Sequence, residues 1–521
     1  MRKTKIYTYV LLLSLTYGVA ACDNSLEQEA KSNLSESTLP KSDDDAIALA
    51  NGMYYLQVNE SSAFGYMTDL TTEHEVSGEA SNSGGGLLSL MNWEPSNSYS
   101  VRIWTALFKT IAASNDVLDK VSANAYVSDK IRARVTGEAY FFRAYSYNYA
   151  VQFWGEVPKV EHNNNATGLV RQPVDTIYNM IVSDLEKAIE RLPEVSEYSS
   201  SDKGRATKGA AQTLLSKVYL TWAQTSDTDT EAEKKEKFSK SAEYARLVTG
   251  YELEEEFLAN WDNGNRNGKE SVFAIQHIMG IGSDASGGNH LTHCSFNSGF
   301  SQTNPHVRPS SWKYYYAYEE GDQRRDGSIA KTLYNPATGE YYTFDEPRFR
   351  KYISTDDPLG SASSRDINRT VFRYAEVLLL LAEAINEYNG APTDEAYEAI
   401  NQVRRRAFKS FPVTVASEHD LEEGLDYEGF KNAIIQEREF ELLYEQKHWL
   451  DLVRWRILVK TLKNSGLDYE KFHKQDVTLK NYRFPIPQSQ RDLNPVGLWQ
   501  NWGYDGYDET KTGVNPYVNR E

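Results

Sequence analysis

Long stretches with apolar residues at helical spacing constrain the fold of this chain more than any other feature. From Lys130 to Trp154, apolar side chains recur every three or four residues, and Gly155 and Pro158 then provide helix-ending signals. Apolar faces of this kind are stable only when helices bury them against one another. The pattern therefore predicts a mainly α-helical protein. Similar stretches cover residues 174–192, 207–223, 237–248, 373–388, 393–407 and 427–462.

Two pairs of these stretches resemble tetratricopeptide units. Residues 374–407 form a window of 34 residues, the characteristic repeat length, and its alanines allow two helices to approach closely around Gly390. The pair within 207–248 is also rich in alanine but has a longer, charged connector. Neither pair matches the full repeat pattern, so the periodicity supports helix pairs more than a regular solenoid. We therefore expect a scaffold of tetratricopeptide-like helical pairs. We place it over about residues 100–250 and 371–465.

Two regions lack this helical pattern. Residues from about 59 to 100 and from about 251 to 368 are rich in small and polar residues, with only short apolar runs. Long non-helical insertions in a helical frame are usually functional loops. We therefore expect an irregular, loop-rich ligand-binding region that is laid over the helical scaffold.

The N-terminus has the features of a bacterial export signal. A basic start precedes the mostly apolar stretch from Ile6 to Ala21, which is too short to span a bilayer comfortably. Small residues stand directly before Cys22, as in the bacterial lipobox, where that cysteine is acylated. Ordinary signal cleavage beside a chance cysteine is the alternative. We predict a lipoprotein signal peptide over 1–21, lipidation of Cys22, a flexible tether over 22–40 and one domain over 41–521.

Charge and composition exclude several classes of protein. Acidic residues outnumber Lys and Arg by 74 to 56, giving a net charge of −18, which argues against a surface built mainly for nucleic-acid phosphates. The chain has only 2 cysteines, too few for a disulfide scaffold or a four-cysteine zinc site. Aromatic residues make up 12% of the chain, and such side chains suit both helix packing and the stacking of sugar rings.

No segment has the pattern of a catalytic or metal centre. His290, His293, Cys294 and His306 lie close together, but the flanking glycines and asparagines predict a loop, so we expect structural roles and no metal site. The acids between residues 436 and 456 could suggest a glycosidase, but arginines lie among them. Acids beside arginine stay ionised and make poor general acids, so we predict an ion-paired helix and no enzymatic activity.

Six spaced strings resemble one protein family, and they occur in the family's order over nearly all of residues 40–521. They are Trp104–Asn115, Glu138–Pro158, Gly204–Leu215, Arg373–Ala384, Glu437–Trp455 and, last, Pro485–Pro487 with Gln500–Tyr504. The family is that of the SusD/RagB-like outer-membrane nutrient-binding lipoproteins. Trp502 stands where proline is common in the family, which is a small departure.

This resemblance implies a function as well as a fold. It implies a helical fold with tetratricopeptide-like units, and a receptor exposed at the cell surface and anchored to the outer membrane by lipid. The receptor would capture oligosaccharide and deliver it to a SusC-like TonB-dependent transporter, with neither catalytic activity nor a cofactor. We expect four motif residues to form buried or half-buried ion pairs that hold the helices together: Arg143, Arg373, Glu441 and Asp451.

The ligand contacts must be chosen by chemistry, because in this family they come from variable loops. Trp93 lies between a glycine run and a predicted helix, outside any periodic apolar face, so its indole could be exposed and stack on a sugar ring. The alternative is that the indole attaches this loop to the body of the protein. The predicted ligand-binding residues are Asp69, Asn92, Trp93, Cys294, Phe296, Asn297, Trp312, Arg365 and Arg369.

Two other functions stay open at this point. One is a lipid-anchored glycosidase that uses loop carboxylates, and the other is an importer receptor whose cargo is peptide. New reducing ends would identify the enzyme, and strong salt dependence of binding would favour peptide.

Overall fold

The computed structural model describes residues 39–58, 61–77, 82–163, 168–277, 307–335, 339–352, 367–466, 468–469 and 472–512. The predicted signal peptide and Cys22 lie outside these residues. Among the described residues, no helix combines the length and the apolar character that crossing a bilayer requires.

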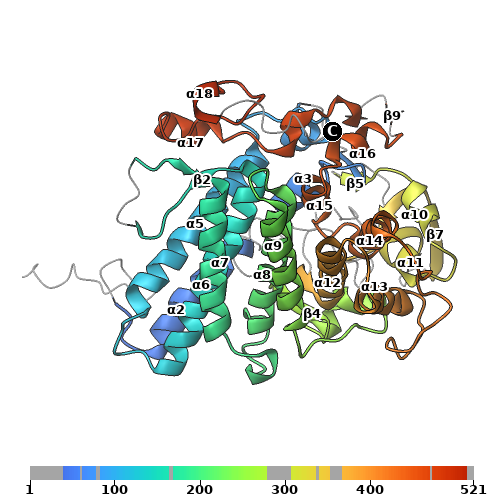
Figure 1. Ribbon diagram of the computed structural model, residues 1–521, viewed down its shortest axis with the longest axis horizontal. Helices are drawn as coiled ribbons and strands as arrows, with labels where there is room; N and C mark the ends of the chain where they lie inside the picture. Colours follow the sequence, from blue (N-terminus) through green and yellow to red (C-terminus); the bar gives the residue numbers. More distant parts are fainter. Residues whose placement is uncertain are drawn as a thin grey trace, which may run out of the picture.

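The first half of the scaffold is a row of long helices. Successive helices from α5 to α9 pack on their chain neighbours and stand side by side (Figure 1). Nearly every side chain from Val135 to Trp154 is buried, because α6 lies between α5 and α7. The helices of this half are α2 (Asp43–Val58), α5 (Ser98–Val121), α6 (Asp129–Trp154), α7 (Val174–Arg191), α8 (Lys208–Thr225) and α9 (Glu231–Arg246).

The second half of the scaffold continues this row, since α12 packs against α8 and α9. Gly390 ends α12 in the left-handed conformation that glycine adopts easily, with φ 71°. Thr393 then caps α13, accepting a hydrogen bond from the backbone N–H of Ala396. The helices are α12 (Tyr374–Asn389), α13 (Asp394–Ala407), α14 (Tyr427–Leu442), α15 (His448–Arg454) and α16 (Leu458–Lys463). The predicted scaffold of helical pairs is therefore confirmed.

One predicted helical stretch is divided. Residues 427–462 form three helices, because the chain turns sharply between α14 and α15 and again before α16. Tyr444, Gln446 and Arg456 have φ values of 63°, 64° and 60° at these turns. Residues other than glycine rarely adopt such backbone angles. Because none of these positions holds a glycine, the sequence did not indicate the turns.

The two irregular regions meet in a two-stranded sheet. Strand β1 (Glu75–Ser77) pairs antiparallel with β5 (Val307–Pro309), with Glu75 opposite Pro309 and Ser77 opposite Val307. The first region also contains α3 (Ser61–Thr68) and α4 (Gly84–Ser89). The second contains η3 (Phe257–Trp261), η4 (Asn263–Asn265), β4 (Ser271–Ile275), α10 (Lys313–Ala317), α11 (Gln323–Ser328), β6 (Ile329–Asn335), β7 (Glu340–Phe349) and β8 (Arg369–Arg373).

Short elements complete the fold, and those that follow α16 lie along the upper edge of the view in Figure 1. Strand β4 pairs with β8, and β6 forms a hairpin with β7. The remaining paired strands are β2 (Val157–Pro158) with β3 (Arg171–Gln172), and β9 (Asp468–Tyr469) with β10 (Phe472–His473). The remaining helical turns are η2 (Val195–Glu197), η7 (Lys474–Asp476), η8 (Leu479–Tyr482), α17 (Gln488–Leu493) and α18 (Glu509–Thr512).

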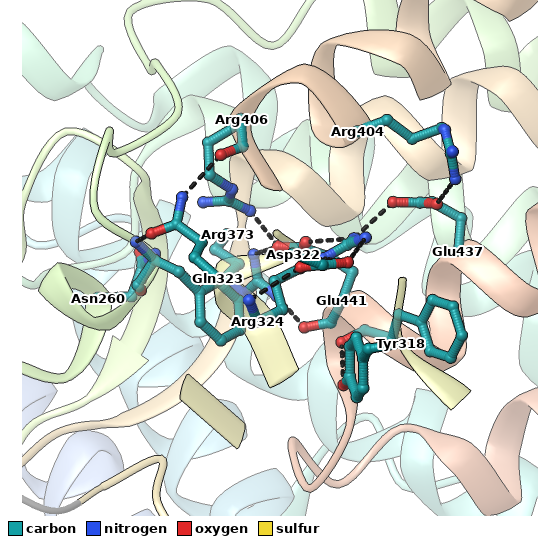
Figure 2. Close-up of polar contacts among 12 residues, drawn as sticks. Asn260, Tyr318, Asp322, Gln323, Arg324, Arg373, Arg404, Arg406, Glu437 and Glu441 are labelled. Carbon is teal, nitrogen blue, oxygen red and sulfur yellow. Dashed lines mark hydrogen bonds and ion pairs between the residues drawn. The ribbon is translucent and has the colours of Figure 1, made fainter. Parts of the chain in front are cut away.

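Buried ion pairs join the irregular region to the scaffold (Figure 2). The carboxylate of Glu441 on α14 accepts hydrogen bonds from Arg324 on α11, Arg373 on β8 and Arg406 on α13. Glu270 bridges two of these arginines, at 2.8 Å from Arg373 and 2.9 Å from Arg406. Although burial opposes ionisation, the nearby guanidinium groups of Arg406, Arg373 and Arg324 hold the pKa of Glu441 below its ordinary value.

The other motif residues are also paired and buried. Arg143 on α6 binds Asp184 on α7 through two contacts of 2.7 Å. Asp451 accepts from Arg438 at 2.8 Å and from Arg454 at 2.9 Å. The predicted burial and pairing of these residues are confirmed, and arginines hold both Glu441 and Asp451, so these two acids are not free to act as a catalytic pair.

Replacing Glu441 should destabilise the protein strongly. In Glu441→Ala, three buried guanidinium groups lose a shared partner, and breaking such a network costs about 3–5 kcal/mol. Urea unfolding monitored by circular dichroism measures this change. Glu428→Ala is the matched control, because Glu428 is an exposed residue of the same helix, and such surface changes stay within about 0.5 kcal/mol. Equal stability of the two variants would contradict the structural role.

Candidate ligand-binding face

An aromatic surface follows β5 directly. Trp312 is half-buried and precedes α10, and its indole Nε1 donates to the backbone oxygen of Asp345 on β7 at 2.9 Å. Its ring meets that of Tyr315 edge-on, with 5.6 Å between centroids. Tyr316 is 65% exposed, although most aromatic side chains in the described residues are buried. We define the aromatic face as Trp312, Tyr315, Tyr316 and Lys331.

Polar groups surround these rings. The ammonium group of Lys331 on β6 lies 5.4 Å from the centre of the Tyr316 ring and 3.2 Å from its hydroxyl group. The hydroxyl of Tyr315 donates to Asp326 at 2.8 Å. Burial and this bond raise the pKa of Tyr315, so the phenol stays protonated and continues to donate. The face thus combines flat apolar surfaces with hydrogen-bonding groups, as sugar recognition requires.

Trp93 lies in the core and not at this face. Its side chain is 2% exposed, and its ring stacks on Phe484 with 4.1 Å between centroids and 5° between planes. Its Nε1 donates to the backbone oxygen of Leu88 at 3.3 Å. We expected an exposed indole, but the Trp93 side chain is buried. This agrees with the alternative that Trp93 attaches its loop to the body of the protein. A sugar could stack on it only if this packing opened.

Asp69 and Arg369 are also buried and have partners within the protein. Asp69 accepts from the backbone N–H of Gln446 at 2.9 Å, and its burial raises its pKa. Arg369 donates to the hydroxyl of Tyr145 at 2.7 Å. Asn92, beside Trp93, is exposed. The structure brings neither Asp69 nor Arg369 to the aromatic face.

The remaining predicted contacts lie outside the described residues: Cys294, Phe296, Asn297 and Arg365. Their segments, 278–306 and 353–366, join the described chain at β5 and just before β8. Sequence reasoning identified Trp312 but missed Tyr315, Tyr316 and Lys331. The run from Trp312 to Tyr316, which holds four aromatic residues in five positions, was the signal that could have found the two tyrosines.

The comparisons with known proteins identify the family. Residues 226–504 match the model of the SusD family, and residues 26–220 match a model described as "Starch-binding associating with outer membrane". Since the first match alone covers more than half of the chain, the chain belongs to the SusD family. Members of this family are non-catalytic binding proteins, in agreement with the prediction that the chain is not an enzyme.

Individual relatives support this assignment over nearly the whole chain. A SusD-like protein of Formosa agariphila is 25% identical over 552 residues, which covers 96% of this chain and 100% of the relative. A solved SusD homologue from Bacteroides thetaiotaomicron has a TM-score of 0.76 and 25% identity, covering 89% of this chain and 98% of that one. The surface glycan-binding protein A of Bacteroides fluxus has a TM-score of 0.71 and 24% identity, covering 89% and 100%, and shows the same fold.

Truncating Trp93 should destabilise the protein. Removing a buried tryptophan leaves a cavity and typically costs about 3–5 kcal/mol. Thermal unfolding of Trp93→Ala should therefore show a clear decrease in the melting temperature. Trp312→Ala is the control, because the half-buried Trp312 ring leaves a smaller void. A Trp93→Ala variant as stable as the wild type would exclude the core role of this side chain.

Proposed function

We propose that this protein is a lipid-anchored receptor of the outer membrane that binds neutral oligosaccharide at its aromatic face. The observation that carries this proposal is the incompletely buried pair of Trp312 and Tyr316, beside Lys331 and the hairpin β6–β7. An exposed aromatic ring gains apolar contact and dispersion when a sugar ring stacks on it, and this gain requires no charge on the ligand.

The delivery of the oligosaccharide to a SusC-like TonB-dependent transporter is part of the proposal. Membership of the SusD family supports it. Glycan capture at the outer membrane is supported by one matched family model, described by starch binding and outer-membrane association, and by one structural relative, a surface glycan-binding protein. The lipobox-like sequence before Cys22 supports an anchor at the same membrane.

A catalytic role at the aromatic face receives less support. Asp326 is the carboxylate that contacts these rings, and it is bonded to Tyr315 and to its neighbour Arg325 at 2.8 Å each. A glycosidase needs two carboxylates that flank the scissile bond, and Asp326 is already engaged by Tyr315 and Arg325. A peptide cargo would use the cations near the face, Arg325 and Lys331, and its binding would weaken with salt.

Loss of the exposed rings should remove oligosaccharide binding. Truncation of a central stacked aromatic residue costs roughly 2 kcal/mol or more, so Trp312→Ala and Tyr316→Ala should each weaken binding about 30-fold. Calorimetry against a panel of neutral oligosaccharides measures this. Tyr126→Ala is the matched control, since Tyr126 is 71% exposed but lies in the turn before α6.

The same assay separates the alternatives. Unchanged affinity in both variants would place the site elsewhere. New reducing ends would indicate a glycosidase. Binding of peptides and not of sugars, with strong salt dependence, would indicate a peptide receptor.

Replacing Cys22 tests the membrane anchor. In Cys22→Ala the acylated side chain is missing, and we expect the protein to leave the membrane fraction, because stable anchoring of this kind requires acyl chains. Fractionation with a high-salt wash, followed by immunoblotting, is the measurement. Cys294→Ala serves as the control and should stay in the membrane fraction. Retention of Cys22→Ala would rule out the lipid anchor at this residue.

A further inference from the structure

A cluster of imidazole and carboxylate groups lies where the chain enters β1. We call it the His–Glu cluster. Glu73 and His74 directly precede β1, Glu439 lies on α14, and His448 begins α15. One possible ligand atom from each of Glu73, His74 and His448 lies within 4.8 Å of the other two. The cluster thus gathers donor groups from both the irregular region and the scaffold.

The donor atoms converge closely. Nε2 of His448 is 2.9 Å from Oε1 of Glu73, and Nε2 of His74 is 3.1 Å from Oε1 of Glu439. Nε2 of His74 is also 4.0 Å from the same Glu73 oxygen. Four ligands arranged tetrahedrally at about 2.0–2.1 Å from a Zn²⁺ ion lie roughly 3.3 Å apart, and the observed separations bracket that value.

The cluster is buried, and several of its polar atoms have no partner. His74 is 1% exposed, Glu73 4% and His448 9%. Among the described residues, Oε2 of Glu73 and Nδ1 of His74 make no hydrogen bond. Neighbouring Tyr314, whose ring meets that of His74 at 4.8 Å, also has an unpartnered hydroxyl group. Unpartnered buried polar groups are costly, so this site favours a ligand that engages them.

The charges of the cluster favour a cation. Glu73 and Glu439 contribute two carboxylates. Glu73 contacts the imidazole of His448, and Glu439 contacts that of His74. A divalent ion coordinated by two neutral imidazoles would balance both carboxylates. Imidazole nitrogen and carboxylate oxygen together are typical ligands of Zn²⁺.

The surroundings hold two of the donors in position. Ser310, just after β5, donates its backbone N–H to the carbonyl of His74 at 2.8 Å, and its hydroxyl donates to the carbonyl of Glu73. The side chain of Glu439 is 27% exposed, which leaves an entry path for an ion. The two imidazole rings are stacked at 3.8 Å and 16°. Coordination therefore requires one ring to turn, and Nδ1 of His74 has no hydrogen bond to lose in that turn.

We propose that the His–Glu cluster binds one divalent transition-metal ion, by its chemistry Zn²⁺. Four protein ligands in a buried position define a structural site, because a catalytic zinc site keeps one position open. The ion would cross-link the segment before β1 to α14 and α15, and Ser310 bonds that segment to the chain that leads to Trp312. Its ligands differ from the histidines between residues 290 and 306 that the sequence analysis considered, which lie outside the described residues.

Metal binding can be measured on the purified full-length chain after treatment with EDTA. Titration with Zn²⁺ should show about one bound equivalent and a rise in melting temperature. His74→Gln and His448→Gln should each weaken binding by at least about 100-fold, since even residues that only support metal ligands alter affinity 10–100-fold. The double variant His290→Gln with His293→Gln is the matched control and should bind like the wild type.

A measurement on the wild type alone covers the case in which a cluster variant fails to fold. Zinc X-ray absorption of the loaded protein should show nitrogen and oxygen ligands, with imidazole scattering and no sulfur. Sulfur coordination would overturn the proposal, because the cluster contains no cysteine. The proposal would also be overturned by wild-type protein that binds no Zn²⁺ at micromolar concentration, or by binding that disappears only in the double variant.

Discussion

The association of the irregular region with the helical scaffold depends on the carboxylate of Glu441. Arginines from α11, β8 and α13 reach it from different directions, so the irregular region and the helical scaffold share one buried network. A buried charge without its partners is strongly unfavourable, and a partly formed network would be worse than none. The network is therefore complete only when these elements take one arrangement. That arrangement also positions the aromatic face.

The sequence predicted the scaffold well and its interruptions poorly, for a physical reason. Helical periodicity and caps are local signals, and Gly390 marked the end of α12 because glycine readily adopts a left-handed conformation. The turns between α14, α15 and α16 use Tyr444, Gln446 and Arg456 in that same conformation. Tertiary contacts hold those residues there, and a single sequence does not display such contacts.

The candidate site depends even more on distant contacts. Trp93 and Trp312 look alike in the sequence, since both are tryptophans in loop-like segments. Phe484, nearly four hundred positions away, covers Trp93, whereas Trp312 is held at its Nε1 by the backbone of Asp345 and keeps part of its ring accessible. The type of residue could be chosen from the sequence, but its exposure was set by the fold.

The pairing of β1 with β5 has a consequence for the stage of folding at which the aromatic face is formed. These strands are separated by more than two hundred residues, and contacts of such long sequence separation form late in folding. The helices α14 and α15, which support the segment before β1, are made later still during synthesis. During synthesis the platform around Trp312 therefore cannot assemble until nearly all of the chain is present. Formation of the aromatic face thus coincides with completion of the chain.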